Sequence, residues 1–436
     1  SSTTFSGRMV SDMTPTVGYT EMKDSGIEWV GVIPKDWDIN ILFQLVSQVK
    51  NKNKDLAETN LLSLSYGKIK RKNIGHTDGL IPASFDSYNI IDTGDIVLRL
   101  TDLQNDQTSL RVGRSTEKGI ITSAYITLRP VNHKTSKFLY YLLHAFDIRK
   151  GFYGMGAGVR QGLTYDEVKV LKLPLPSISE QTAIATYLDT QCAKIDEIIA
   201  EAKVSIEDYK QWKASIIYEA VTKGLDPNAE MKDSGIEWIG EIPMDWNSMR
   251  FKFVATVKAN LVDPKDYPKL LQVAPDNMVK DTGTLLPCNT VAESGVISWN
   301  HLFYKGQLLY SKIRPTLNKV VVAPFDGLCS ADMYPIETTQ NTKFMLYVML
   351  SEYFVQQVAL CTADRVKMPK INQEELGNIT VIIPPVSKQK QIVDYLDSRC
   401  NFFDMLIKEK ETLVSDLETY KKSLIYEVVT GKRRVC

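Results

Sequence analysis

Cysteine pairs, long apolar runs and histidine clusters are all missing from this sequence. None of its cysteines forms a C-x-x-C pair: they lie at positions 192, 288, 329, 361, 400 and 436. Their spacing argues against a disulfide framework or a zinc site and fits a reducing cytosol. No apolar run approaches the roughly 18–20 residues that span a bilayer. Residues 1–21 read as a flexible polar leader, without the apolar segment of a signal peptide. We therefore expect a cytoplasmic protein.

Catalytic motifs are equally scarce. The sequence has no G-x-x-x-x-G-K-[ST] phosphate loop, no H-E-x-x-H and no G-x-S-x-G. One match exists: FYGMG at 152–156 fits the F-x-G-x-G loop that holds S-adenosylmethionine in adenine methyltransferases. That loop should follow a strand, whereas here it follows a predicted helix, and the second half of the chain lacks a counterpart. We predict no catalysis, cofactor or metal for this chain alone. A self-contained adenine methyltransferase is the alternative.

The whole chain carries no net charge, yet its charge is unevenly distributed. Lys plus Arg and Asp plus Glu each number 52. Residues 22–175 nevertheless carry 21 basic and 16 acidic side chains, while residues 176–230 carry 5 and 10. A local basic face is therefore compatible with a neutral total.

What the chain does contain is a repeat. MKDSGIEWVGVIPKDW at 22–37 returns as MKDSGIEWIGEIPMDW at 231–246, and the copies differ only at Val30, Val32 and Lys35. Its glycines and proline exclude a long helix, so we predict an extended segment that packs its two tryptophans against the domain that follows. The repeat indicates an internal duplication.

A second repeat follows further along each half. PSISEQTAIATYLDTQCAKID (176–196) matches PPVSKQKQIVDYLDSRCNFFD (384–404), and SIIYEAVT (215–222) matches SLIYEVVT (423–430). Each block opens a long stretch without Pro or Gly, with apolar residues at heptad spacing. We predict two long helices that pair antiparallel through Ile184, Leu188, Ile195, Ile198, Tyr209, Trp212, Ile216, Ile392, Leu396, Phe403, Leu406, Leu413, Leu417, Tyr420 and Leu424.

The predicted fold class is α+β, with two globular modules of mixed strands and helices, two long antiparallel coiled-coil helices and a pseudo-twofold repeat. The predicted boundaries are 1–21 for the leader, 22–175 for module 1, 176–230 for the first helix and linker, 231–383 for module 2, 384–431 for the second helix and 432–436 for a basic tail. Within the modules we predict strands at 61–65, 94–100 and 120–128, and helices at 137–148 and 343–354.

Basic residues cluster in loop-like stretches where the two halves diverge. Phosphate contacts need mobile cations, and base readout uses Arg, Lys, Asn and Gln. The candidate DNA-binding residues are Lys50, Lys52, Lys54, Lys68, Lys70, Arg71, Lys72, Arg99, Arg111, Arg114, Arg160, Lys312, Arg314, Asn318, Lys319, Arg365, Lys367 and Lys370. Ordinary solvated loops are the competing interpretation.

Taken together, these marks resemble the specificity subunits of type I restriction–modification systems. The resemblance covers residues 22–430 and rests on the duplicated MKDSGIEW-x-G-x-IP-x-x-W segment and on the YLD-containing start of each long helix. It implies two target recognition domains that each read half of a bipartite site in double-stranded DNA. The helical pair is expected to fix the half-site spacing.

The resemblance also implies partners. Two methylation subunits that carry S-adenosylmethionine are expected to dock on the helices, and restriction subunits are expected to carry ATP and Mg. The chain itself would be a non-catalytic recognition subunit. A coiled-coil scaffold without DNA specificity is a further alternative.

Overall fold

The structure is a computed structural model that describes residues 18–72, 84–106, 108–155, 162–365 and 367–435. The chain forms two compact units: residues 1–202 with 413–436, and residues 203–412. Each unit holds one module together with parts of both long helices. The predicted boundaries of modules and helices are a different division of the same chain and stay a prediction.

The repeated MKDSGIEW segment forms a β-hairpin in each copy. β1 (Met22–Asp24) pairs with β2 (Val32–Pro34), and β13 (Met231–Asp233) pairs with β14 (Glu241–Pro243). Gly26 and Gly31 take positive φ at the turn, which glycine adopts at little cost. The prediction of a single extended segment was therefore wrong.

The tryptophans of the two hairpins are used unequally. Trp37 and Trp246 are both buried, whereas Trp238 is 45% exposed. Trp29 is half-buried and packs against Phe146, with ring centroids 5.1 Å apart. The packing prediction holds for both tryptophans of the first copy and for only one of the second.

Module 1 is built on a four-stranded antiparallel sheet in the order β4–β11–β8–β9. Residues on β8 alternate between two cores, because Ile96 and Leu98 face one cluster and Val97 faces another. The main sheet comprises β4 (Val46–Gln48), β8 (Ile96–Leu98), β9 (Val112–Arg114) and β11 (Ile126–Pro130). Around it lie the antiparallel pairs β5 (Leu62–Ser65) with β6 (Lys68–Arg71), β7 (Asn89–Ile91) with β10 (Gly119–Ile121), and β3 (Asp38–Ile41) with β12 (Lys172–Leu175).

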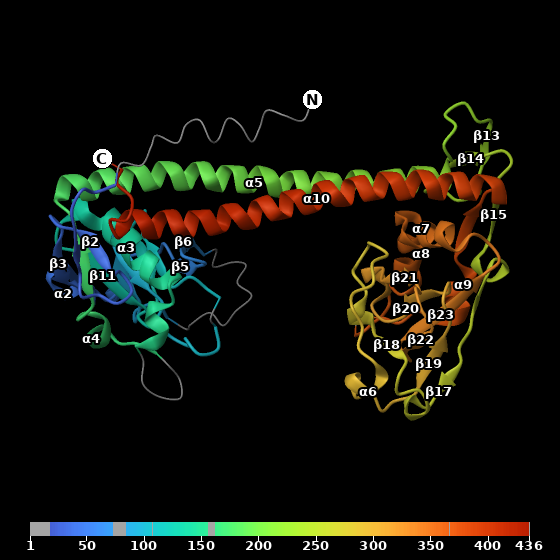
Figure 1. Ribbon diagram of the computed structural model, residues 1–436, viewed down its shortest axis with the longest axis horizontal. Coiled ribbons are helices and arrows are strands. Elements are labelled where there is room, and N and C mark those ends of the chain that lie inside the picture. Colours follow the sequence, from blue (N-terminus) through green and yellow to red (C-terminus); the bar gives the residue numbers. More distant parts are fainter. Residues whose placement is uncertain (1–17, 73–83, 107, 156–161, 366, 436) are drawn as a thin grey trace. The chain divides into compact units, whose positions relative to one another are not determined.

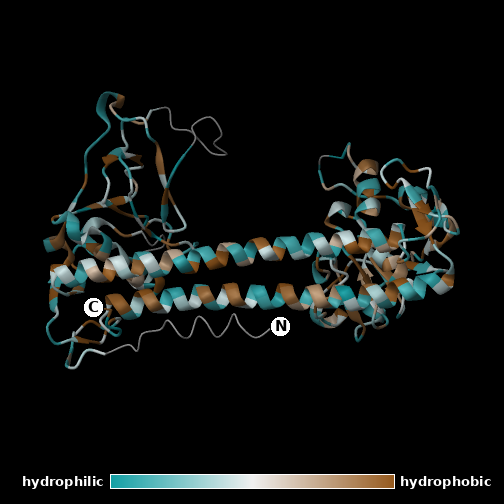
Figure 2. Cartoon of the chain, turned by 90° about the horizontal axis from the view of Figure 1, so that it is seen from above, coloured by the Kyte–Doolittle hydropathy of each residue, from teal (hydrophilic) through white to brown (hydrophobic). Residues whose placement is uncertain are grey.

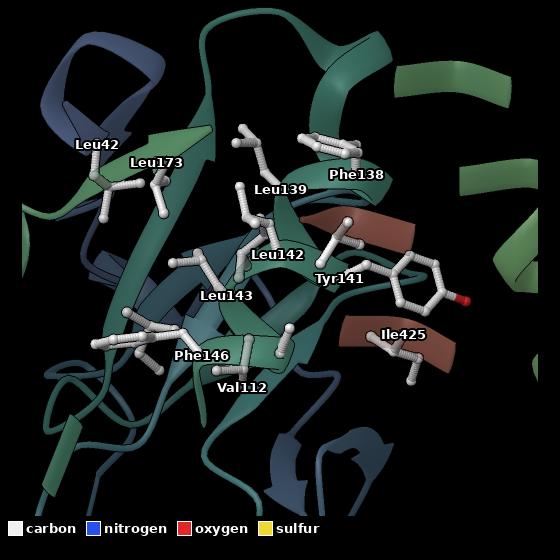
Figure 3. Close-up of a cluster of buried hydrophobic side chains, with 14 of the residues drawn as sticks. Leu42, Val112, Phe138, Leu139, Tyr141, Leu142, Leu143, Phe146, Leu173 and Ile425 are labelled. Atoms are coloured by element: carbon white, nitrogen blue, oxygen red, sulfur yellow. The ribbon is translucent and has the colours of Figure 1, made fainter. Parts of the chain in front are cut away.

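The predicted strands at 61–65 and 94–100 correspond to β5 and β8, whereas 120–128 contains two strands instead of one. A turn separates β10 from β11, because the backbone N–H of Tyr125 donates to the carbonyl of Thr122 (3.2 Å). Helix α3 (Ser136–Ile148), predicted at 137–148, packs on the sheet (Figure 1). Its apolar face builds the core of this unit, which also takes in Ile425 from the second long helix (Figure 3).

Module 2 repeats this frame. Its main sheet has the order β16–β23–β20–β21, and a second sheet has the order β17–β19–β22–β18. The strands of the main sheet are β16 (Ala255–Val257), β20 (Leu308–Ser311), β21 (Val320–Val322) and β23 (Met333–Thr338). Those of the second are β17 (Leu261–Val262), β18 (Leu271–Val273), β19 (Asn300–Phe303) and β22 (Gly327–Ser330). The pair β15 (Asn247–Arg250) with β24 (Thr380–Ile383) corresponds to β3 with β12.

The helix predicted at 343–354 is two helices, α7 (Thr342–Leu350) and α8 (Glu352–Cys361). Ser351 breaks it, because its backbone is extended (φ −72°, ψ 149°) and its hydroxyl donates to the carbonyl of Val348 (2.5 Å). Among the described residues, no single helix has the length and apolarity of a membrane span. Only α7 and α8 counted together, across a 63° bend, reach that composition.

The long helices are α5 (Ile178–Thr222) and α10 (Val386–Val429). Inside the first unit they pair through Lys421 and Asp196 (2.6 Å), and inside the second through Lys213 and Asp404 (2.7 Å). These two ion pairs are counterparts in the repeat, which aligns Asp196 with Asp404 and Lys213 with Lys421. Within each unit the two helices run antiparallel, with apolar bands recurring along both (Figures 1 and 2).

The inward positions of the helices follow a heptad. On α5 the buried residues recur at alternating intervals of three and four: Ala185, Leu188, Cys192, Ile195, Ile199, Ala202 and Ile206. Their counterparts on α10 are buried or half-buried: Val393, Leu396, Cys400, Phe403, Ile407, Lys410 and Val414. The predicted heptad is therefore confirmed, but at every second position its frame lies one residue too early.

This shift of frame corrects part of the predicted helix seam. Tyr420 is 37% exposed, so its assignment to the seam was wrong. Trp212 is 57% exposed and reaches Phe403 only from the margin, with ring centroids 6.5 Å apart. Ile198 is half-buried beside the buried Ile199. The remaining predicted seam residues are buried or half-buried: Ile184, Leu188, Ile195, Tyr209, Ile216, Ile392, Leu396, Phe403, Leu406, Leu413, Leu417 and Leu424.

The predicted basic tail is anchored to the first hairpin. Lys432 Nζ donates to the carbonyl of Val30 (2.8 Å) and also to that of Val32. The end of α10 and the first hairpin are therefore held together inside the first unit.

Candidate nucleic-acid interface

The cations of module 1 closest to the N-terminus lie in an exposed connection and on an exposed strand. Lys50, Lys52 and Lys54 follow β4, and Lys52 Nζ donates to the carbonyl of Ser87 (2.8 Å). Lys68, Lys70 and Arg71 belong to β6, and Lys72 follows it. Alternation along a strand puts Lys68 and Lys70 on one face and Arg71 on the other.

Two of these β6 cations already have protein partners. Arg71 Nε donates to Glu117 (2.6 Å), and Lys68 lies 3.9 Å from Asp196 on α5. Both ion pairs are largely exposed and therefore weak. Lys70 on β6 and Lys72 directly after it are exposed and form no ion pair within the described part of the chain.

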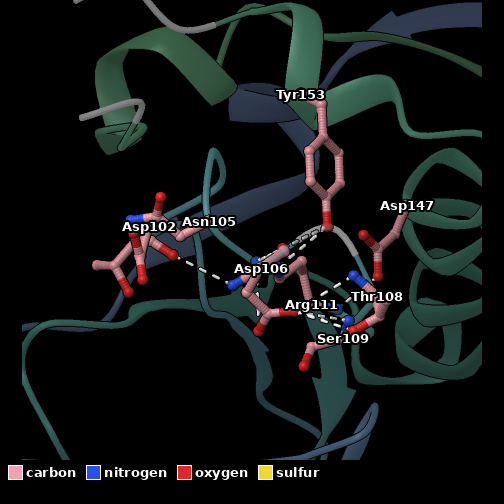
Figure 4. A network of polar contacts seen from close by, with 9 residues as sticks. Asp102, Asn105, Asp106, Thr108, Ser109, Arg111, Asp147 and Tyr153 are labelled. Atoms are coloured by element: carbon pink, nitrogen blue, oxygen red, sulfur yellow. Dashed lines mark hydrogen bonds and ion pairs between the residues drawn. The ribbon is translucent and has the colours of Figure 1, made fainter. Parts of the chain in front are cut away.

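Arg111 was predicted to contact DNA, and the structure contradicts this. Its side chain is completely buried, and its guanidinium donates to the carbonyl of Thr101 (3.1 Å), the carbonyl of Asp106 and the hydroxyl of Tyr153 (3.3 Å) (Figure 4). An arginine that is completely buried and bonded within its own module cannot reach a phosphate. Its role is to hold the loop between β8 and β9 (residues 99–111) against the rest of the module.

Two carboxyl groups complete this network. The N–H of Arg111 donates to Asp147 Oδ2 (2.5 Å), yet burial raises the pKa of Asp147 to about 6. In contrast, the N–H of Ser109 donates to Asp106 Oδ1 (3.0 Å) and holds the pKa of Asp106 well below its usual range. Asp106 therefore stays ionised at neutral pH and fixes the turn at 106–109 as an acceptor.

In module 2 the structure brings four predicted cations to one edge. The loop between β20 and β21 (residues 312–319) lies beside residues 367–371, because Arg314 N–H donates to the carbonyl of Pro369 (2.8 Å) and Ile371 N–H to that of Lys312 (3.0 Å). We call Lys312, Arg314, Lys367 and Lys370 the basic edge of module 2. The side chains of Arg314 and Lys367 are exposed and form no ion pair within the residues described here.

Other predicted contacts of module 2 are engaged elsewhere. Asn318 is buried and its amide donates to the carbonyl of Leu350 (3.3 Å), so its assignment as a DNA contact was wrong. Lys319 Nζ donates to the carbonyl of Pro275 (2.7 Å). Arg365 forms a two-fold ion pair with Glu375. Lys370 forms an ion pair with Asp332 (3.1 Å), and the ammonium group of Lys312 lies over the ring of Tyr334.

The loops of the two modules occupy corresponding places. Leu163 N–H donates to the carbonyl of Leu100 (2.9 Å) in module 1, as Ile371 N–H does to Lys312 in module 2. The strands on either side match, whereas the loops differ in length and in side chains. Arg99 is half-buried at the start of the first loop, and Arg160 lies outside the described residues. Arg114 Nε donates to Ser136 Oγ (2.8 Å) beneath α3 and away from this edge.

Sequence reasoning missed the polar residues of the first loop. Gln104 and Asn105 are both exposed there, and Asn105 Nδ2 donates to Asp102 Oδ1 (2.7 Å). The predicted contacts were almost all cations, although amide side chains read adenine edges as arginine reads guanine. The run TDLQNDQTS itself was a signal that could have indicated them.

The structure also addresses the glycine motif of the first half. Gly151–Gly154 form the 3₁₀ turn η3 directly after α3, whereas a glycine loop for S-adenosylmethionine follows a strand. Gly156, the last residue of the motif, is outside the described residues. Within those described, no group of three His, Cys, Asp or Glu is placed to hold a metal ion.

Comparisons with known proteins agree with this architecture. The chain is 29% identical over 427 residues to the EcoDI type I restriction enzyme specificity subunit of Escherichia coli, covering 92% of this chain and 90% of the relative. It is 25% identical over 431 residues to the putative MjaX specificity subunit of Methanocaldococcus jannaschii, covering 93% and 96%. A solved chain from work on complex assembly and conformational transition of the type I R-M system shares the fold, with a TM-score of 0.65, 14% identity and coverage of 91% and 98%.

The profile of one family, described as the type I restriction modification DNA specificity domain, matches residues 46–208 and again residues 243–414. The two matches together span well over half of the chain and fall on the two structural repeats. The protein therefore belongs to the type I restriction–modification DNA specificity family and carries its domain twice.

Proposed function

We propose that this chain is the DNA-recognition subunit of a type I restriction–modification complex, in which each module reads one half of a bipartite site. The observation that carries this proposal is the duplicated specificity domain, in which one frame presents two different edges. Module 1 offers the 99–111 loop with its amides, and module 2 offers the basic edge. Similar frames with different edges suit two different half-site sequences.

The proposed partners follow from the repeat. Counterpart ion pairs on α5 and α10 give the helices an internal twofold pattern, and two identical methylation subunits can dock on equivalent surfaces of such a pair. S-adenosylmethionine would then belong to the methylation subunits, and ATP with Mg to the restriction subunits. The chain itself contributes recognition and spacing without catalysis, in the cytoplasm.

Exchange of module 1 tests the proposal. The β3–β12 pairing places Ile41 opposite Lys172, so residues 41–173 can be replaced by the corresponding residues of another family member with both junctions on paired strands. Methylation profiling of DNA from cells with the complete system should show a changed first half-site, with the second half-site and spacer intact. A motif that changes in both halves, or in neither, would contradict one module reading one half.

Neutralising the basic edge is expected to weaken DNA binding by the assembled complex. Arg314→Ala with Lys367→Ala removes two exposed cations, and each lost phosphate contact lowers the slope of log affinity against log salt by about 1. Binding should be measured at several salt concentrations. Arg365→Gln is the matched control, because that guanidinium is already paired with Glu375, and it should leave the slope unchanged. A double variant with an unaltered slope would exclude this edge from DNA contact.

A further inference from the structure

A lysine and a tyrosine on α3 both bond to the carboxylate of one aspartate of α5 in the first unit, an arrangement that we call a clamp. Lys137 Nζ lies 2.5 Å from Asp189 Oδ2, and the hydroxyl of Tyr141 donates to Asp189 Oδ1 (2.7 Å). Lys137 and Tyr141 are one helical turn apart, so both reach the same carboxylate. The tyrosine is buried, and burial together with the bond to Asp189 raises its pKa.

The second unit repeats this arrangement with different surroundings. Lys343 Nζ lies 2.6 Å from Asp397 Oδ2, and the hydroxyl of Tyr347 donates to Asp397 Oδ1 (2.8 Å). The corresponding distances in the two units are nearly equal. The residues around the two clamps differ. Tyr140 precedes Tyr141, whereas Leu346 precedes Tyr347. Arg114 lies near Asp189, and the position that corresponds to Arg114 in module 2 is occupied by Val322.

We propose that these two clamps are positioning devices that fix the tilt of each module on its long helix, and that they thereby set how strictly the half-site spacing is read. The inference rests on the proposed function. It concerns Asp189 and Asp397 as positioning residues, since neither is placed among the candidate DNA contacts.

Geometry supports a positioning role over a purely cohesive one. Each module already shares one apolar core with the long helices, to which the fully buried Leu188 and Leu396 belong. Apolar contact is non-directional and lets surfaces slide, whereas two charge-assisted bonds to one carboxylate fix both direction and register. The partly exposed carboxylates (38% and 34%) add little stability. Their bonds mainly restrict orientation.

The test uses the full methyltransferase complex and duplexes whose half-sites stay fixed while the spacer varies by one or two base pairs. For Asp189→Asn with Asp397→Asn, the preference for the native spacer over its neighbours is expected to fall by about tenfold, which is the effect of one hydrogen bond lost in positioning. The half-site bases should stay the same. Tyr141→Phe with Tyr347→Phe, which keeps the charges, should shift the preference in the same direction by a smaller factor.

Glu207→Gln is the matched control, because its ion pair with Lys210 (2.9 Å) lies on α5 without touching a module, and it should keep the native preference. If the clamps were merely structural, all spacers would lose activity equally and the ratio would not change; that result overturns the inference. Should the aspartate variants fail to fold, the tyrosine pair decides, and an unchanged ratio there has the same meaning. A native complex without any spacer preference would instead contradict the proposed function itself.

Discussion

Replacing Arg111 by methionine is expected to lower the free energy of unfolding of the first compact unit by about 3–5 kcal/mol. Methionine fills part of the volume but removes the guanidinium that donates to the carbonyls of Thr101 and Asp106 and to the hydroxyl of Tyr153. Among the described residues, the carbonyl of Asp106 keeps only the hydroxyl of Tyr153 as a donor (3.2 Å). The loop 99–111 should then detach from the module. Hydrogen exchange of peptides from this loop and from α3 measures the loss directly.

Arg149→Met is the matched control for this substitution. Arg149 is exposed and its guanidinium lies 4.9 Å from the ring centroid of Tyr426, an interaction worth about 0.5–1 kcal/mol. The second unit should exchange as in the parent protein in both variants. Equal protection of the 99–111 loop in Arg111→Met and Arg149→Met would mean that the buried guanidinium does not organise the loop. In the assembled complex, Arg111→Met should also relax recognition at only one half-site.

Lengthening both long helices by four residues is expected to shift the preferred DNA spacer upward by about two base pairs. Four helical residues add about 6 Å, and a base pair rises about 3.4 Å. The insertions belong between Val204 and Ser205 and at the counterpart position between Thr412 and Leu413. Val204 is exposed, and the apolar faces on either side would be rotated by only about 40°.

The control places the same four residues between Pro227 and Asn228, in the exposed connection after α5. That insertion changes chain length without changing helix length, so the spacer should stay as it was. Methylation of duplexes with a graded series of spacers measures both proteins. An unaltered preference after the helix insertions would refute the idea that the helices act as a ruler.

Prediction from sequence succeeded where the signal was duplicated or periodic over a long stretch. The hairpin repeat and the YLD repeat located two copies of one frame, and the Pro- and Gly-free stretches placed α5 and α10 closely. The heptad period was right, but its frame was wrong at every second position. Ile198, Trp212 and Tyr420 were predicted in the seam, whereas the inward positions are the residues that follow them, Ile199, Lys213 and Lys421. A shift of one residue leaves the period unchanged, so only helix packing distinguishes the two frames.

Single residues of the candidate site were harder to assign. Charge singled out Arg111 and Arg314 alike, yet one guanidinium is completely enclosed by its own loop and the other is exposed on the basic edge. Burial of a charged side chain depends on how its loop folds back on it. The acceptors of Arg111 lie 10, 5 and 42 positions away (Thr101, Asp106 and Tyr153), and no local pattern reveals them. Loop identity was predictable, while side-chain direction was not.

By itself the sequence determined that the chain is a duplication, that each half joins a globular module to a long helix, and which family the pattern resembles. These features can be predicted because repeats and helical periods are local properties of the sequence. The tertiary structure alone decided that the hairpins cover the ends of the long helices and that the loops after β8 and β20 occupy corresponding edges. It alone also joined Asp189 to Lys137 and Tyr141, and Asp397 to Lys343 and Tyr347. All of these depend on contacts between residues dozens to hundreds of positions apart, which are fixed by packing and hydrogen bonding in the folded chain.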